Sequence, residues 1–196
     1  REAQLGVVWS NYTPSLIILL GLGIATFTKS YFIMLASDPQ IFELSTEVDR
    51  WVDLGLPSGI LWAAYNVGAT SPEEYGNYYA WGELHTKGNY NPETYNYCSW
   101  TGTIWQYENI GLSICGKSYD VATKEWGNNA RMPSSKEAEE LVQKCKWIKD
   151  YYKAVYGYRV VGPNGNSIFL PFTGYKQSSE IRMKGTYGYY WTGSLD

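Results

Sequence analysis

The composition of the chain changes sharply near residue 48, and this change most constrains how the chain can fold. Before it, residues 16–27 and 31–36 are almost wholly apolar and are separated by three polar residues. After it, glycine, asparagine, tyrosine and tryptophan dominate. The sequence therefore predicts two parts, residues 1–47 and residues 48–196, that bury their apolar groups in different ways.

The apolar N-terminal part fits more than one structure. Residues 15–36 are long enough to cross a bilayer, although Lys29 near their middle would cost about 3 kcal/mol there. Short apolar runs broken by turn residues also fit two buried strands of a β-sandwich. The run GVVWSNYTPSL (residues 6–16), followed by LLGL and SYFIMLAS, resembles the later strands of fibronectin-type-III-like modules. We expect a truncated β-sandwich remnant, with a membrane-associated segment and a degenerate leader as the alternatives.

The charge and the aromatic content narrow the class of partner. Sixteen Lys and Arg against nineteen Asp and Glu give a formal net charge of −3, and the basic residues are scattered along the chain. Nucleic-acid binders gather basic residues on one segment or face, so DNA and RNA are poor candidates. Aromatic residues reach 17%, with 19 Tyr and 9 Trp. Because Tyr and Trp offer large, rigid contact areas with a polar group, this composition favours a protein that binds partners at its surface.

Local signals over residues 48–196 predict an α+β domain with short strands and one main amphipathic helix. Ser134 and Glu137 fit a capping box, which predicts a helix from about Ser135 to Lys146. Apolar residues at helical spacing then define its buried face: Ala138, Leu141, Val142 and Cys145. The turn-rich residues 162–166 separate two β-prone runs and predict a hairpin centred on Asn164 and Gly165.

Two shorter helical segments are also indicated. Asp120 is placed to cap a short helix that stops at Gly127. Residues 71–74 place a cap, a proline and a carboxylate in order, which predicts one helical turn ending at Gly76.

Several polar and aromatic residues are best interpreted as parts of the scaffold. We expect Trp62, Trp81 and Trp191 to lie in the core, with their indole N–H groups bonded to loop carbonyls. We expect Arg131, just before the main helix, to pair with a nearby carboxylate or loop carbonyl.

Residue types that carry catalysis are sparse. His85, the only histidine, lies in a polar loop, and no serine or cysteine nucleophile sits in a recognisable elbow. Glu73 and Glu74 are explained by helix-start electrostatics better than by a glycosidase pair. The three cysteines, Cys98, Cys115 and Cys145, lack CxxC spacing, which argues against zinc. We interpret them as structural thiols, with one disulfide and one free thiol as the alternative. The sequence therefore predicts no catalytic residue, no metal site and no cofactor.

Three stretches carry a recognisable family pattern. They are VDLGLPSGILWAAYNVGATSPEEYGNYYAWGE (52–83), ARMPSSKEAEELVQKCKW (130–147) and GYRVVGPNGNSIFLPFTGY (157–175) leading to GTYGYYWTGSL (185–195). Together they resemble the Fibrobacter succinogenes major paralogous domain, a family abundant in gut Bacteroidetes and similar to the C-type-lectin-like fold. The resemblance implies a C-type-lectin-like domain over residues 48–196 that lacks its last strands, because members continue past the YWTGSL-like stretch. An unpaired sheet edge would follow.

The stretch from Thr173 to Tyr189 is the expected ligand-binding region. It is polar and glycine-flanked, with spaced aromatics and no apolar periodicity, so it predicts an exposed loop on a rigid scaffold. We expect Tyr175, Arg182, Tyr187 and Tyr189 to contact the ligand, through ring stacking or pocket filling by the tyrosines and donation by Arg182.

A different orientation of these side chains is equally compatible with the sequence. Strand alternation would turn Tyr187 and Tyr189 inward beside Trp191.

The function favoured by these features is a non-catalytic, adhesin-like binding module that recognises a glycan or protein ligand. The resemblance implies a cell-surface or extracellular location, as an outer-membrane lipoprotein or a secreted protein. A membrane would be contacted only through an anchor outside the chain or at its N-terminal segment. The alternative is a structural or assembly domain of a repeat-built surface protein, with no ligand site of its own.

Overall fold

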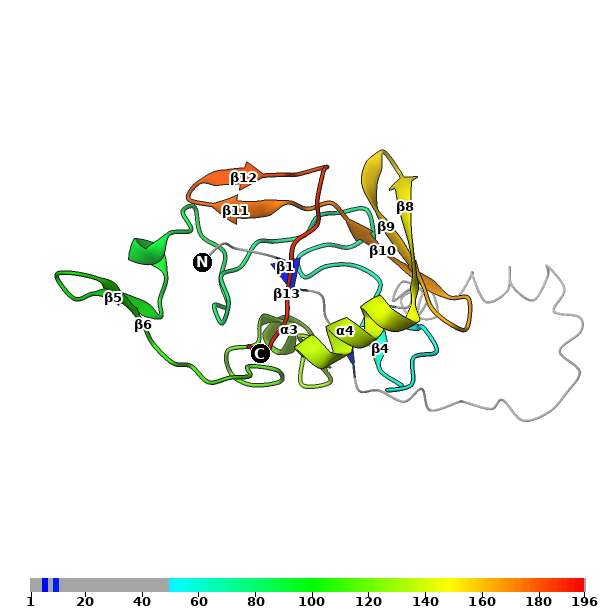
Figure 1. The fold of residues 1–196 in the computed structure, drawn as a ribbon, viewed down its shortest axis with the longest axis horizontal. Coiled ribbons are helices and arrows are strands. Elements are labelled where there is room, and N and C mark those ends of the chain that lie inside the picture. Colours follow the sequence, from blue (N-terminus) through cyan, green and yellow to red (C-terminus); the bar gives the residue numbers. More distant parts are fainter. Residues whose placement is uncertain (1–4, 7–8, 11–49, 196) are drawn as a thin grey trace, which may run out of the picture. The chain divides into compact units, whose positions relative to one another are not determined.

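The computed structural model describes residues 5–6, 9–10 and 50–195 (Figure 1). Arg1–Thr13 and Trp51–Asp196 group into one compact unit, and Pro14–Arg50 form a second. The apolar segment at residues 15–36 lies outside the described residues, as does most of the predicted β-sandwich remnant. Among the described residues, no helix is long and apolar enough to cross a membrane.

The first unit is a mixed α+β structure built from small sheets and short helices, as the sequence predicts. Helix α4 (Ser135–Lys144) begins at the predicted capping box, in which Ser134 and Glu137 bond to each other's backbone N–H groups. Helix α3 (Val121–Trp126) begins after Asp120, whose side chain accepts from the N–H groups of Ala122 and Thr123. A 3₁₀ turn, η1, covers Pro92–Thr94.

Two details of the helical predictions are wrong. Residues 71–74 form a hydrogen-bonded turn rather than a helical turn, because the Glu74 carboxylate reaches back to the N–H and hydroxyl of Thr70. On α4, Leu141 is buried but the Val142 side chain is 60% exposed. Adjacent helical residues point about 100° apart, and the buried stripe of α4 is too narrow to include both.

A four-stranded antiparallel sheet has the strand order β3-β4-β2-β7. Its strands are β3 (Trp51–Asp53), β4 (Leu61–Ala63), β2 (Trp9–Ser10) and β7 (Ala130–Arg131). A further short strand, β1 (Leu5–Gly6), pairs in parallel with β13 (Tyr190–Trp191). Residues 5–6 and 9–10, which composition places in the N-terminal part, thus pair with strands from the rest of the unit.

A three-stranded antiparallel sheet follows α4 directly, in the order β10-β9-β8 (Figure 1). It consists of β8 (Lys146–Tyr152), β9 (Val155–Val161) and β10 (Ser167–Pro171). The β9–β10 hairpin turns through residues 162–166 and confirms the predicted hairpin. Strand β8 is an element that the sequence analysis does not predict.

Two further hairpins extend from the unit. The first joins β5 (Cys98–Trp100) to β6 (Trp105–Tyr107) and projects outward (Figure 1). The second joins β11 (Tyr175–Gln177) to β12 (Glu180–Arg182) within the stretch predicted as an exposed loop.

Two of the tryptophans expected in the core anchor loops through their indole N–H groups; Trp81 is buried and Trp191 is half-buried. Trp81 is 2% exposed, and its indole N–H donates to the Thr192 carbonyl at 2.9 Å. The Trp191 indole N–H donates to the Tyr79 carbonyl at 3.1 Å. Trp62 is likewise 2% exposed and lies in the cluster between α4 and the three-stranded sheet. These contacts hold the last described segment of the chain against the core.

Candidate ligand-binding site

The four residues predicted to contact a ligand lie together. Tyr175 on β11 and Arg182 on β12 are cross-strand partners. The rings of Tyr175 and Tyr189 meet edge to face with centroids 5.1 Å apart, and those of Tyr187 and Tyr189 lie 6.5 Å apart. We call Tyr175, Tyr187 and Tyr189 the tyrosine cluster.

The tyrosine cluster is open to solvent on one side. Tyr187 is 56% exposed, and Tyr175 and Tyr189 are half-buried. The inward orientation beside Trp191 is therefore wrong for Tyr187. Exposed rings that touch one another form a continuous apolar surface edged by phenol hydroxyls, which suits a ligand with mixed apolar and polar character.

Arg182 supplies a cation next to the tyrosine cluster. Its Nη2 donates to Glu180 Oε2 at 3.3 Å, and both side chains are at least half exposed. An ion pair in this setting contributes little to stability, since water solvates both partners. Most of the guanidinium N–H groups thus remain open to a ligand.

Close backbone contacts fix the segment that carries Tyr187 against β11. The Gly174 N–H donates to the Tyr187 carbonyl at 2.7 Å. Gly174 has a φ of 64°, and a Cβ atom there would lie 2.0 Å from the Arg182 carbonyl oxygen. Only glycine fits this position without a shift of the backbone. The tyrosine cluster is therefore held by backbone geometry and not by side-chain contacts alone.

The far end of the β11–β12 hairpin is anchored by the buried residue Tyr90. Tyr90, which is 3% exposed, exchanges two backbone hydrogen bonds with Ser178 at 2.8 and 2.9 Å. Its hydroxyl donates to the Tyr78 carbonyl at 2.5 Å. The Lys176 ammonium adds a bond of 3.3 Å to the Lys87 carbonyl.

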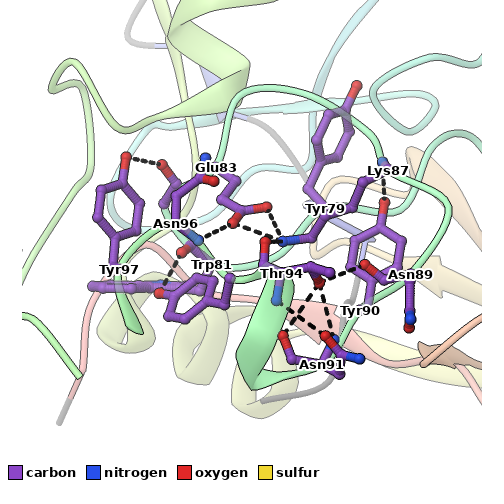
Figure 2. A network of polar contacts seen from close by, with 12 residues as sticks. Tyr79, Trp81, Glu83, Lys87, Asn89, Tyr90, Asn91, Thr94, Asn96 and Tyr97 are labelled. Carbon is purple, nitrogen blue, oxygen red and sulfur yellow. Dashed lines mark hydrogen bonds and ion pairs between the residues drawn. The ribbon is translucent and has the colours of Figure 1, made fainter. Parts of the chain in front are cut away.

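A polar network organises that loop (Figure 2). Glu83 is 3% exposed, and its carboxylate accepts from Lys87 Nζ and from the Asn96 N–H, each at 2.7 Å. Lys87 Nζ also donates to the Thr94 carbonyl at 2.6 Å. A buried charge that is fully paired in this way stabilises a loop and offers no open group to a ligand. We interpret the network as the support of the β11–β12 hairpin.

A cavity of about 350 Å3 adjoins the tyrosine cluster, and we call it the aromatic groove. Its floor is one face of the three-stranded sheet, and its other wall is the segment from Thr186 to Tyr190. Its lining residues are Trp147, Lys149, Tyr158, Leu170, Phe172, Thr186, Tyr187, Gly188 and Tyr190. Because Tyr187 belongs to both, the aromatic groove and the tyrosine cluster form one continuous site. The volume lies within the range of small-molecule sites.

Sheet register explains why the floor residues share a face. Lys149 on β8 and Leu170 on β10 both pair with Tyr158 on β9, so the three side chains stand side by side. Trp147 precedes Lys149 by two residues and therefore points to the same face.

The opposite wall is fixed by hydrogen bonds. The Tyr190 hydroxyl donates to the Pro171 carbonyl at 2.6 Å, and burial raises the pKa of this phenol well above its ordinary value. The Gly185 N–H donates to the Phe172 carbonyl at 2.7 Å. The groove is therefore preformed, which lowers the entropy that a ligand loses on binding.

Three residues of the site were not predicted from the sequence: Trp147, Lys149 and Tyr158. The signal available was the alternation in residues 146–152, where tryptophan, lysine and tyrosine recur at every second position. Helix α4 ends only two residues before β8, so the helical pattern obscured this strand.

Among the described residues, the histidine and two of the cysteines lie in surroundings that do not activate them. His85 is exposed, and its Nε2 lies 3.2 Å from Lys124 Nζ, so a cation rather than an orienting carboxylate faces the ring. Burial raises the pKa of the Cys115 and Cys145 thiols, which disfavours the reactive thiolate. Within the described ranges, no group of three His, Cys, Asp or Glu side chains is placed to hold a metal ion.

Comparison with known proteins reveals no relationship. No known protein family matches the chain, and neither a curated protein nor a solved structure matches it. The function must therefore be inferred from the chemistry of the site itself.

Proposed function

We propose that this unit is a non-catalytic, adhesin-like binding module that holds a glycan or protein ligand at the tyrosine cluster and Arg182. The observation that carries the proposal is the meeting of three tyrosine rings and one guanidinium on a single exposed surface. Tyrosine and arginine are enriched among the residues that dominate binding energy in protein interfaces. The adjoining aromatic groove adds a preformed concave surface.

The fold and location proposed for the protein rest on sequence resemblance. Motifs in residues 52–83, 130–147 and 157–195 resemble the Fibrobacter succinogenes major paralogous domain. On that basis we assign a C-type-lectin-like fold and a place at the cell surface or outside the cell. Both assignments agree with a function in recognition.

A structural or assembly role is the second candidate, and the β5–β6 hairpin favours it. Residues 98–107 contain no charged side chain. Trp100 is 53% and Ile104 is 63% exposed, and the Trp100 ring packs on Trp105 at 5.3 Å. An exposed apolar surface of this kind suits docking to a neighbouring domain.

Alanine substitutions test the proposed function. Tyr175, Arg182, Tyr187 and Tyr189 are replaced singly, and binding to glycan arrays and host-protein arrays is measured beside the melting temperature. We expect at least one of the four variants to weaken binding about 30-fold, equivalent to about 2 kcal/mol, with the fold intact.

Two variants on the β5–β6 hairpin serve as controls. Tyr107→Ala removes a tyrosine that is 43% exposed and lies outside the site, so its binding should equal that of the wild type. Loss of binding in Trp100→Ala, with none in the four site variants, would favour the assembly role. A fall in melting temperature without selective loss of binding would show that the tyrosines serve packing only.

A further inference from the structure

The rings that line the aromatic groove present both faces and edges to its interior. Trp147 and Tyr158 meet at 73° with centroids 5.6 Å apart, and Tyr158 and Phe172 meet at 74° and 5.2 Å. Because neighbouring rings are nearly perpendicular, the surface of the groove is curved. A flat apolar ligand can therefore stack on the face of one ring while its edge touches the next ring.

Polar groups at the rim are open to a ligand. Within the described part of the chain, the hydroxyls of Tyr158, Thr186 and Tyr187 have no hydrogen-bond partner. Each hydroxyl can donate one hydrogen bond and accept others. An aliphatic ligand would displace the water bound to these three hydroxyls and offer them no hydrogen bond in return. The groove is therefore better suited to a ligand that carries polar groups.

Lys149 adds an unneutralised positive charge to the groove. Its Nζ lies 5.7 Å from the centroid of the Phe172 ring, and no carboxylate among the described residues forms an ion pair with it. By contrast, Lys153 pairs with Glu73 and Arg159 pairs with Asp150 on the same hairpin. Residues 146–161 carry four basic side chains and one acidic side chain, although the whole chain has a net charge of −3. The local field therefore favours an anionic ligand.

We infer that the aromatic groove binds a sugar residue that carries a carboxylate, as in a uronic-acid or sialic-acid unit of a glycan. The sugar ring stacks its C–H face on one of the two rings Trp147 and Tyr158 and meets the other with its edge. Its hydroxyls bond to the rim hydroxyls, and its carboxylate pairs with Lys149. This assignment rests on the proposed function and names the ligand class within it. It extends the site from the tyrosine cluster onto the face of β8 and β9.

Matched sugars that differ in charge test the inference. Wild-type protein is titrated with an oligogalacturonide and its methyl ester, and separately with sialyllactose and lactose, while tryptophan fluorescence is followed. We expect the acidic member of at least one pair to bind with a Kd about tenfold lower than its neutral partner. Which pair responds distinguishes a uronic acid from a sialic acid. Equal binding within both pairs, or no binding of any of the four, would overturn the inference.

Two lysine variants on β8 complete the test. Lys149→Met keeps the aliphatic stem and should abolish the preference for the acidic sugar, at an unchanged melting temperature. Lys146→Met is the matched control, because an offset of three residues places Lys146 on the opposite face of the strand. If both variants keep the preference, Lys149 is not the carboxylate partner and the inference fails.

The experiments distinguish failure of the acidic-sugar inference from failure of the proposed binding function. Failure of all four sugars, with a protein ligand still lost in the tyrosine-cluster variants, would reject the acidic sugar and keep the proposed function. Sugar binding that depends on Lys149 and Tyr187 but not on Tyr175 or Tyr189 would keep the acidic sugar and move the site wholly into the groove.

Discussion

Arg131 and Glu137 form the best-defined charged contact near the start of α4. The guanidinium donates to both carboxylate oxygens at 2.5 and 2.7 Å, and the Ser134 N–H donates to Glu137 Oε2 at 2.8 Å. The predicted pairing of Arg131 with a nearby carboxylate is thus confirmed. Burial, the largest single influence, would raise the pKa of Glu137, but the bonds from Arg131 and Ser134 together hold it below the ordinary 4.5.

The depressed pKa of Glu137 makes stability depend on pH. Since the folded-state pKa lies below the unfolded-state value, the carboxylate stabilises the protein fully above about pH 4.5, and this contribution is lost as the pH falls through the folded-state pKa. We expect Glu137→Gln to lower the free energy of unfolding at neutral pH by about 1–3 kcal/mol. The difference from wild type should shrink as the pH falls below about 4.5.

Urea unfolding followed between about pH 7 and about pH 3 measures this difference. Glu139→Gln is the control, since Glu139 is exposed on the same helix and its carboxylate accepts a hydrogen bond from Gln143. A gap between wild type and Glu137→Gln that stays constant with pH would contradict the prediction.

Single residues were predictable where the signal was local. Ser134, Glu137 and Asp120 cap helices through contacts only two or three positions away, so the spacing alone identified them. The four expected ligand residues were likewise found together, because they lie within one short stretch of chain. Lys149 was missed because its place in the groove depends on Thr186 and Tyr187, which approach it only in the folded chain.

At the scale of elements, the β8–β9 hairpin is held by a turn of unusual composition. Lys153 and Ala154 are the two loop residues between the paired Tyr152 and Val155, and their φ angles are 45° and 67°. Two-residue hairpin loops with both φ angles positive favour asparagine and glycine. Without either residue, the turn gave no signal in the sequence, and β8 was not predicted.

This turn leads to a prediction of increased stability. A non-glycine residue in the left-handed region costs about 1–2 kcal/mol in the folded state. Replacing it by glycine removes this strain, but part of the gain is lost because glycine has more conformational freedom in the unfolded chain. We therefore expect Ala154→Gly to raise the free energy of unfolding by about 0.5–1 kcal/mol. The Lys153–Glu73 ion pair is unaffected by the change.

Chemical denaturation compares Ala154→Gly with the same substitution in α4. Ala138→Gly should lower the free energy of unfolding by about 1 kcal/mol, because glycine is a poor helix former. If both variants lost the same free energy of unfolding, Ala154 would not hold a left-handed conformation in solution.

At the scale of the whole molecule, the α+β class followed from the sequence, but the pairing of the N-terminal strands did not. Strands β1 and β2 have two residues each, which is too short for any alternation to appear. The division near residue 48 reflects where apolar residues are dense, and composition carries no information about which backbone groups pair. Residues 5–6 and 9–10 therefore belong to a unit that the sequence predicted to start at residue 48.

Strand β2 lies between β4 and β7, so its removal should weaken the four-stranded sheet. A fragment of residues 48–196 leaves β4 and β7 without their shared partner and β13 without β1. Each backbone group that loses its partner in a buried sheet costs about 1 kcal/mol or more. We expect the free energy of unfolding of this fragment, measured by urea denaturation, to be about 2–4 kcal/mol lower than that of the whole chain.

The matched variant removes the other piece of the N-terminal part. Replacing residues 14–47 by a flexible glycine–serine linker keeps β1 and β2 and should restore the urea midpoint to that of the whole chain. Since both variants lack the apolar segment, their difference isolates the pairing of β1 and β2. Equal midpoints for the fragment 48–196 and the linker variant would show that the two short strands add nothing, and that the unit is complete from residue 48 onward.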